Sequence, residues 1–281
     1  MFKNNRKSLV LMLLALVIVL AACGQKPAAV APQNGGGQES AAKETKLDQI
    51  KKAGKLVVGT SADYPPYEFH KEVNKKDEIV GFDIEIAKAL AKDLGVPLEV
   101  KDMKFDGLLA ALEAGNVDFV ISGMTPTPER QKSVDFTKIY YTAVQKVVVR
   151  AEDKDKYKSI DDLKGKKVGA QKGATQETIV KEQMPNSDLK ALSKISDLML
   201  DLKNKKTDAL VVELPVATAY LSKNPDLVLS DIKIENPDSG SAIAVKKGSP
   251  ELVEAMNKSL EKLVNEKAVD KLVIEANELV E

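Results

Sequence analysis

The chain of 281 residues has no Trp, one His, one Cys and three Arg against 39 Lys. One thiol excludes an internal disulfide, and one imidazole leaves too little material for a catalytic triad or a His/Cys metal cluster. We therefore expect neither a metal nor a cofactor, and we interpret the lone His70 as a surface residue. Because Lys is the usual cation of this chain, each of its three Arg residues, Arg6, Arg130 and Arg150, needs a specific reason.

The charge has no excess of either sign. The 42 acidic side chains balance the 42 basic ones, so the broad basic field that attracts nucleic acid is missing. Hydrophobic residues make up 43% of the chain, which is enough for buried cores, and the length suits about two domains. We expect a packed, monomeric protein with no nucleic-acid partner.

Residues 1–22 have the layout of an export signal. A positive head containing Lys3, Arg6 and Lys7 precedes an apolar run over 9–22. At 14 residues this run is shorter than the ~20 that a membrane-spanning helix needs. The pattern predicts that the chain leaves the cytoplasm.

Cys23 follows Leu20-Ala21-Ala22, which resembles the lipobox of bacterial lipoproteins, where the cysteine becomes the lipid-bearing N-terminus. The alternative is an ordinary cleavage site of small residues. Residues 23–45 are rich in Gly, Ala, Pro, Gln and Ser, so we expect a flexible linker. Together these features predict a protein anchored by lipid on the extracellular face of the cell membrane.

Short β-branched runs alternate with segments of helical period in the rest of the chain. The first series predicts strands and helices over 55–60, 84–94, 97–102, 107–114 and 117–122. After the apolar run 147–149, a second series predicts elements over 167–170, 175–183, 198–203, 209–212 and 215–222. A strand over 242–245 and a helix opened by Ser249 and Pro250 follow. This order predicts an α/β fold of two lobes with largely parallel sheets.

Two features of the first series suit a binding cleft. Tyr64 lies in a loop marked by Pro65 and Pro66, where a large ring is well placed to line a cleft. The segment 121–130 runs from a strand end into an expected helix start, where backbone N–H groups suit a carboxylate and Arg130 adds two parallel hydrogen bonds. A surface Arg pairing with Glu129 explains Arg130 equally well.

The second series contains weaker signals. The segment 168–177 also runs from a strand through a Gly-containing turn to a helix start, but it is neither a P-loop nor a Rossmann turn. Glu213 follows an apolar strand, at the edge where open α/β sheets bind ligands, and could meet an ammonium group. A structural role explains Glu213 equally well, because a negative charge at the start of a helix interacts favourably with the helix dipole.

Seven segments agree in order and spacing with one known family: 58–69 (VGTSADYPPYEF), 80–83 (VGFD), 122–130 (SGMTPTPER), 134–137 (VDFT), 140–141 (YY), 162–169 (DLKGKKVG) and 242–245 (AIAV). From about residue 55 to residue 270 the chain therefore resembles the extracellular solute-binding proteins, family 3, of polar amino-acid ABC importers. Their lipid anchor in bacteria without an outer membrane matches Cys23.

The resemblance implies a two-lobed, periplasmic-binding-protein-like clamp of type II with two hinge strands, near 140–144 and 237–241. Lobe 1 would then combine residues 46–140 with 242–281, and lobe 2 would span 145–236.

Ligand contacts at one end of the substrate follow from the same resemblance. In similar proteins the ligand carboxylate meets the Arg of a Thr-x-x-x-x-Arg segment, here Thr125 and Arg130. It also meets the turn of the second lobe, which contains Ala174, Thr175 and Gln176.

The ammonium group in such proteins meets an acid after the last core strand of lobe 2, here Glu213, with carbonyl help at Ser122 or Gly123. Tyr64 and Phe105 would sandwich the substrate side chain.

This sequence departs from the family pattern at three places. Many relatives have an acid at the position of Ser61, and here Asp63 or Glu68 is the candidate replacement. The usual Tyr-Gly before the returning strand is Gly240-Ser241, and the usual terminal Trp-Phe is replaced within 276–279.

The function implied is capture of a free polar L-amino acid for the permease and ATPase subunits of an ABC importer. The acids near Tyr64 favour arginine or lysine, then histidine or glutamine. The alternative is a dehydratase-like enzyme on the same scaffold, with Glu68 or Glu213 as general acid.

Overall fold

The computed structural model of the protein describes residues 44–235 and 238–280. The predicted export signal, the predicted lipid site at Cys23 and the predicted linker up to residue 43 lie outside these ranges. Within them, no helix combines the length and the apolar character needed to cross a bilayer.

The sheet of the first lobe has the strand order β5-β1-β6-β14-β7. β1 is parallel to β5 and β6, whereas β14 is antiparallel to both of its neighbours. Its strands are β1 (Leu56–Thr60), β5 (Leu98–Asp102), β6 (Phe119–Val120), β7 (Val134–Phe136) and β14 (Ala244–Lys246). The parallel strands therefore end together, at one edge of the sheet.

The helices of this lobe are α1 (Lys46–Ala53), α2 (Phe82–Leu94), α3 (Leu108–Glu113), α7 (Pro250–Asn265) and α8 (Ala268–Val280). In α2, Ile84, Ala87 and Leu90 are buried, as the helical period predicts. Gly95 then takes a left-handed conformation, φ 73°, and its N–H bonds to the carbonyl oxygen of Ala91. The local sequence thus sets both the buried face and the end of α2.

A three-stranded hairpin sheet, absent from the sequence-based prediction, follows β1. It consists of β2 (Asp63–Tyr64), β3 (Glu68–Val73) and β4 (Lys76–Val80), paired antiparallel in the order β2-β3-β4. Charged residues fill much of β3 and β4, so the alternation typical of a half-buried strand is hidden. The hairpin places Tyr64 and Glu68 beside the end of β1.

The sheet of the second lobe has the order β10-β9-β11-β8-β12, in which β9 is parallel to β10 and β11 while β8 is antiparallel to β11 and β12. Its strands are β8 (Tyr141–Arg150), β9 (Lys167–Gln171), β10 (Asp188–Leu192), β11 (Ala209–Glu213) and β12 (Leu227–Leu229), and its helices are α4 (Thr175–Gln183), α5 (Ile195–Lys203) and α6 (Leu214–Ser222).

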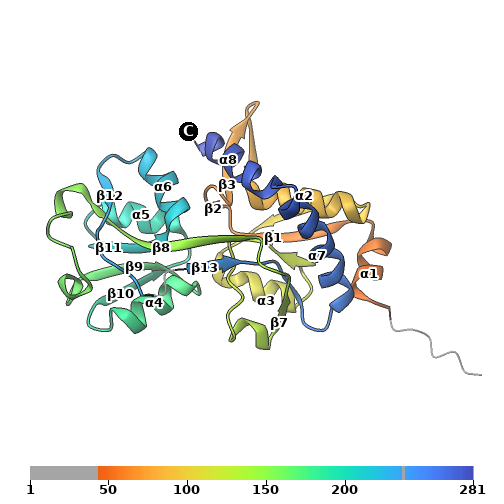
Figure 1. Ribbon diagram of the computed structural model, residues 1–281, viewed down its shortest axis with the longest axis horizontal. Helices are drawn as coiled ribbons and strands as arrows, with labels where there is room; N and C mark the ends of the chain where they lie inside the picture. Colours follow the sequence, from red (N-terminus) through yellow and green to blue (C-terminus); the bar gives the residue numbers. More distant parts are fainter. Residues whose placement is uncertain (1–43, 236–237, 281) are drawn as a thin grey trace, which may run out of the picture. The chain divides into compact units, whose positions relative to one another are not determined.

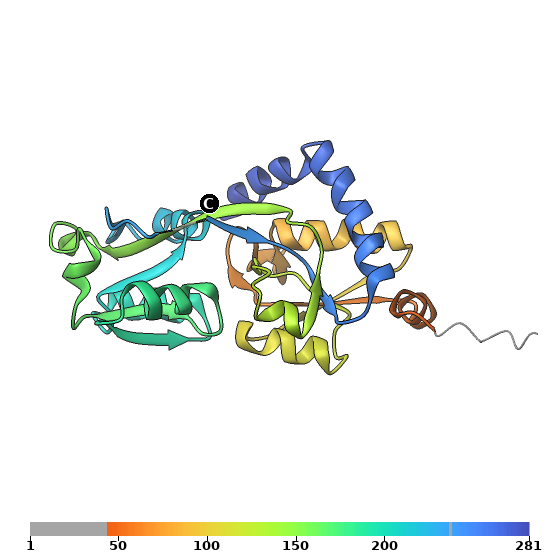
Figure 2. The same ribbon diagram turned by 60° about the horizontal axis from the view of Figure 1, so that its bottom comes forward.

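Two paired strands connect the lobes (Figure 1). The first half of β8 pairs antiparallel with β13 (Asp238–Ser241), from Asp238 opposite Val144 to Ser241 opposite Tyr141. The second half of β8 belongs to the sheet of the second lobe. After β13 the chain enters β14, so α7 and α8 return to the first lobe and pack on α2, an arrangement that is also visible in Figure 2.

Several local predictions need correction. The sheets are mixed, because β8 and β14 join their sheets antiparallel to the neighbours. Only residues 119–120 of the expected strand 117–122 form ladder pairs. The helix expected to start at the end of the segment 121–130 is one 3₁₀ turn, Arg130–Lys132, and a second such turn, Phe105–Gly107, precedes α3. Further 3₁₀ turns lie at Ala151–Asp153 and Ile160–Leu163.

Candidate ligand-binding site

A small cavity lies where parallel strands of the two sheets end. The first lobe contributes residues that follow β1, β5 and β6, and the second lobe contributes the end of β9 and the start of α4. The lining residues are Tyr64, Phe105, Ser122, Gly123, Thr125, Arg130, Gln171, Ala174, Thr175 and Gln176. All the predicted ligand-binding residues belong to this lining except Ser61, Asp63, Glu68 and Glu213, and Gln171 is an addition that sequence reasoning missed.

Arg130 directs its guanidinium group across the cavity. One terminal nitrogen donates to the carbonyl oxygen of Thr125 at 2.7 Å, and the other donates to the carbonyl oxygen of Gly173, in the second lobe, at 2.9 Å. The guanidinium carbon lies 5.4 Å from the ring centre of Phe105. Burial lowers the pKa of Arg130 to about 10, so the group stays charged at neutral pH.

The turn between β9 and α4 forms the opposite wall. Gly173 takes φ 76°, and its N–H donates to Glu177 at 2.7 Å. The N–H of Ala174 donates to the carbonyl oxygen of Gln171 at 3.2 Å. Thr175 is the first residue of α4, where backbone N–H groups lack partners within the helix and the dipole favours an anion.

Glu213 lies behind the lining, at the end of β11, and is 1% exposed. Its Oε2 accepts from the hydroxyl group of Tyr67, in the first lobe, at 2.7 Å, and its Oε1 accepts from Gln145 at 3.4 Å. The amide oxygen of Gln145 accepts from Gln176 at 3.0 Å, and Gln176 lies 3.5 Å from the hydroxyl group of Tyr64. A network therefore connects this carboxylate to two lining residues.

Asp63 also lies outside the lining. One carboxylate oxygen accepts from the N–H of Ser196, at the start of α5, at 3.3 Å, and the other accepts from Ser61 Oγ at 3.3 Å. The hydroxyl group of Tyr220, in α6, donates to the main-chain oxygen of Asp63 at 2.9 Å. Burial raises the pKa of Asp63. Asp63 thus joins the two lobes at the edge of the cavity.

Glu68 lies beneath the floor of the cavity. Its side chain is fully buried and accepts a short hydrogen bond from Ser122 Oγ. Ser61 lies next to this contact, because its N–H donates to the same hydroxyl oxygen at 3.2 Å. Neither Ser61 nor Glu68 contributes to the lining.

Contacts across the cavity place the lobes in a closed arrangement. Besides the bonds of Arg130, Glu213 and Asp63 just described, Lys172 of the second lobe forms a 2.9 Å ion pair with Asp106 of the first. Closed lobes remove the ligand and its partners from water, which strengthens their electrostatic interactions.

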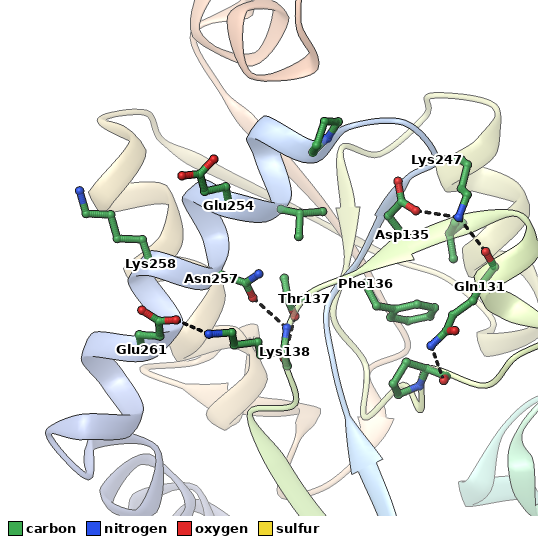
Figure 3. Close-up of a pocket in the computed structure, with 14 residues that line it drawn as sticks. Gln131, Asp135, Phe136, Thr137, Lys138, Lys247, Glu254, Asn257, Lys258 and Glu261 are labelled. Carbon is green, nitrogen blue, oxygen red and sulfur yellow. Dashed lines mark hydrogen bonds and ion pairs between the residues drawn. The ribbon is translucent and has the colours of Figure 1, made fainter.

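A larger cavity is a groove of about 960 Å³ between β7 and α7 (Figure 3). Two ion pairs occupy it: Lys138 with Glu261 at 2.5 Å, and Lys247 with Asp135 at 2.7 Å. Four of its charged groups are thus paired with each other, and neither Arg130 nor the end of a parallel strand lines the groove. The smaller cavity, which contains most of the predicted residues, is therefore the candidate site.

His70 lies at the surface, away from this cavity. In the part of the chain that the structure describes, no group of three or more His, Cys, Asp or Glu is arranged to hold a metal ion. His70 contacts Asp77 at 2.8 Å and Asp102 at 3.2 Å, with a side chain that is 44% exposed. Its position at the surface, as the sequence predicts, leaves it outside the cavity.

Two α/β lobes joined by paired strands and closed over a polar cavity define a solute-binding clamp. The sequence model of the bacterial extracellular solute-binding proteins, family 3, matches residues 56–275. The chain belongs to this family.

Three similar proteins extend the comparison. The arginine-binding extracellular protein ArtP of Bacillus subtilis (strain 168) is 45% identical over 223 residues, which cover 78% of this chain and 84% of ArtP. The L-arginine-bound crystal structure of AbpA, an amino acid ABC transporter substrate-binding protein from Streptococcus pneumoniae, has a TM-score of 0.81 and 45% identity, covering 83% of this chain and 98% of AbpA. AncCDT-1, an ancestral amino acid-binding protein and a precursor of cyclohexadienyl dehydratase, has a TM-score of 0.75 and 39% identity, covering 82% and 99%.

These comparisons confirm the predicted two-lobed fold of type II and the predicted family. The family and its relatives are binding proteins of transporters, so the chain is a solute-binding protein rather than the dehydratase-like enzyme of the alternative hypothesis.

Proposed function

We propose that this protein captures L-arginine, or a closely related amino acid with a cationic side chain, outside the cell and delivers it to the permease and ATPase subunits of an ABC importer. It acts as a monomer, anchored to the outer face of the cell membrane by lipid on Cys23. The names of ArtP, an arginine-binding protein, and of AbpA bound to L-arginine support this choice of ligand.

The charge around the cavity is the observation that carries the choice. Glu68, Asp83 and Glu213 are at most 1% exposed, and Asp63 is half-buried beside them. Arg130 is the cation in the lining. Acidic side chains therefore outnumber guanidinium groups around the cavity. A ligand whose side chain is positive balances this excess, whereas a neutral ligand leaves buried negative charge uncompensated.

One orientation of the ligand satisfies the fixed groups. The α-carboxylate meets Arg130 and the N-terminal turn of α4 at Thr175, where positive charge and free N–H groups are available. The ammonium group points toward Glu213. The aliphatic and guanidinium parts of the side chain pack between the rings of Tyr64 and Phe105, where a cation gains further attraction.

Titration with matched ligands tests the proposal. Citrulline has almost the shape of arginine but carries a neutral urea group in place of the guanidinium. We expect arginine to bind at least roughly 30-fold more tightly, a difference of ~2 kcal/mol, because the buried carboxylates lose their counter-charge with citrulline. Isothermal titration calorimetry measures both affinities, with lysine, histidine and glutamine as further ligands. Equal affinities would exclude the cationic preference, and no heat with any amino acid would refute the function itself.

Asp63 and Tyr220 allow charge and lobe closure to be separated. Asp63→Asn removes a negative charge. We therefore expect it to weaken the binding of arginine about tenfold more than the binding of citrulline, a difference of ~1.4 kcal/mol. Tyr220→Phe removes only the hydrogen bond to the main chain of Asp63, so it should weaken both ligands equally, by roughly fivefold or ~1 kcal/mol. If Asp63→Asn also weakens both equally, Asp63 holds the lobes together without contributing to the preference for a cation.

The lipid anchor has its own readout, independent of the ligand. Mass spectrometry of the mature N-terminus, taken from the membrane fraction of the producing cells, should find Cys23 as the first residue with lipid on its sulfur. A mature chain that begins elsewhere would leave binding intact but remove the anchor.

A further inference from the structure

Two buried carboxyl groups beneath the cavity each have one oxygen without a hydrogen-bond partner. Glu68, in β3, and Asp83, in α2, are both fully buried. Among the described residues, Glu68 Oε2 and Asp83 Oδ1 are two of the few buried side-chain polar atoms that lack a partner. A buried carboxylate oxygen without a partner costs free energy, so its presence in both acids needs an explanation.

The other oxygen of each acid binds the floor of the cavity. Glu68 accepts from the hydroxyl group of Ser122. Asp83 Oδ2 accepts from the N–H of Gly123 at 2.9 Å and from the hydroxyl group of Tyr140 at 2.9 Å. Ser122 and Gly123 are consecutive lining residues, so the two acids together hold this turn in place. Gly123 has φ 54°, and an added Cβ would lie 3.2 Å from the ring of Tyr64.

The charged groups around the pair do not neutralise it. The acids whose charges act on Glu68 are Asp83 and Asp63, and Glu213 acts on Asp83 from the second lobe. Tyr140 and Ser122 are neutral donors. Arg130 donates to main-chain oxygens of Thr125 and Gly173, and no ion pair joins it to Glu68 or Asp83 in the described residues. Two ionised carboxylates in this position would be like charges in a low dielectric, which is strongly unfavourable.

We infer that Glu68 and Asp83 share one proton between their unpartnered oxygens, and that this acid–carboxylate pair positions the Ser122–Gly123 wall of the ligand site. The proton turns two repelling acceptors into a donor and an acceptor, which satisfies both buried atoms at once. Glu68 and Asp83 are therefore positioning residues for the ligand. The second half of the inference rests on the proposed function, whereas the shared proton does not.

The direction of the pKa shifts agrees with this geometry. Burial, followed by the charge of Asp83, raises the pKa of Glu68 well above its ordinary value, and burial raises the pKa of Asp83 to about 7. The folded protein thus keeps a proton that the unfolded chain has released above about pH 4.5. Folding stability from the pair is complete below that pH, falls as pH rises, and is lost above the folded pKa values.

Glu68→Gln tests the pair, because the amide nitrogen donates to Asp83 as the shared proton does, while the amide oxygen still accepts from Ser122. Between about pH 6 and about pH 8.5, we expect the denaturant midpoint of the unmodified protein to fall with rising pH and that of Glu68→Gln to stay nearly constant. Glu72→Gln, an exposed change in the same strand β3, should follow the unmodified protein. Identical pH profiles for the unmodified protein and Glu68→Gln would overturn the inference.

Infrared spectroscopy of the unmodified protein observes the proton without any variant. At neutral pH we expect the carbonyl stretch of one buried protonated carboxyl group, which shifts in heavy water and disappears in Glu68→Gln. Absence of that band at neutral pH would also overturn the shared proton. Asp83→Asn supplies a second variant if Glu68→Gln does not fold, and the same loss of the band is expected.

Arginine titrations over the same pH range test the positioning role. As the pH rises, the affinity of the unmodified protein should change about tenfold relative to that of Glu68→Gln, the equivalent of one pKa unit, because only the unmodified protein loses the proton that positions the wall. The ammonium group of the ligand also titrates at alkaline pH, which changes the affinity of both proteins equally. The test is therefore the difference between the pH profiles of the two proteins. Parallel affinity profiles together with divergent stability profiles would refute the positioning role. Because stability and infrared spectra are measured without ligand, failure of the arginine proposal is recognised separately.

Discussion

Replacing Arg130 by alanine is expected to weaken arginine binding by tens- to thousands-fold, or about 2 to 5 kcal/mol. The guanidinium is the cation in the cavity lining, and its terminal nitrogens form the wall nearest the turn before α4. Without it, the ligand carboxylate is buried with no charged partner. Arg130→Lys keeps the charge but loses the two parallel donors. Its affinity for arginine should therefore lie between the affinities of the unmodified protein and of Arg130→Ala. Calorimetry at neutral pH measures all three proteins.

Lys132→Ala is the matched control for this change. Lys132 belongs to the same 3₁₀ turn, but its side chain is 72% exposed and pairs with Glu129. Its removal should leave the affinity unchanged within about twofold, because surface ion pairs contribute little.

Agmatine, which is arginine without the carboxylate, completes the test as a double-mutant cycle. The unmodified protein should bind agmatine far more weakly than it binds arginine. The Arg130→Ala variant should bind agmatine and arginine with similar, weak affinities. Undiminished affinity of Arg130→Ala for arginine would remove Arg130 from the site.

Gly81→Ala is expected to lower the free energy of unfolding by about 3 to 5 kcal/mol. Gly81 precedes α2 with φ 124°, a conformation that residues with a Cβ rarely adopt. An added Cβ would overlap the carbonyl oxygen of Tyr67, which accepts from the N–H of Asp83 at 3.0 Å. Neither the strand hairpin nor α2 can move without disturbing the other. Denaturant titration of the ligand-free protein measures the effect.

Gly95→Ala separates backbone strain from this overlap. Gly95 ends the same helix with φ 73°, and an added Cβ would meet nothing within 4 Å. It should therefore cost only the left-handed strain, about 1 to 2 kcal/mol. Equal losses for the two variants would mean that the approach of Gly81 to Tyr67 is not a constraint on the fold.

Features set by residues close along the chain can be predicted from the sequence, whereas features set by distant residues cannot. The period of α2 and the glycine after it predict that helix well, because they depend on neighbours within one or two turns. The family resemblance implies that the segment 122–130 and the turn before α4 contact the same ligand. Residues of both segments line one cavity. The hairpin β2–β4 was missed, since its charged strands carry no alternating pattern.

The positions of the four acids show where sequence reasoning stops. Asp63, Glu68 and Glu213 were all candidates for direct ligand contact, and the fold places each behind the lining, with a different partner. Tyr67 and Glu213 are 146 residues apart and Ser122 and Glu68 are 54 apart. No local pattern predicts such pairs. Asp83, in the segment 80–83, is buried beneath the cavity, and no local pattern in the sequence indicates this.

The amino-acid sequence by itself determined the alternation of strands and helices, the scarcity of His and Cys that leaves too little material for a catalytic triad or a His/Cys metal cluster, and the segments that mark the family. Each of these depends on composition or on residues close along the chain. Only the tertiary structure decided that β8 and β13 pair between the lobes, that Arg130 reaches Gly173, and that Glu68 meets the floor of the cavity. These contacts depend on how the lobes pack, because burial and charge at a point in space arise from segments far apart in the chain.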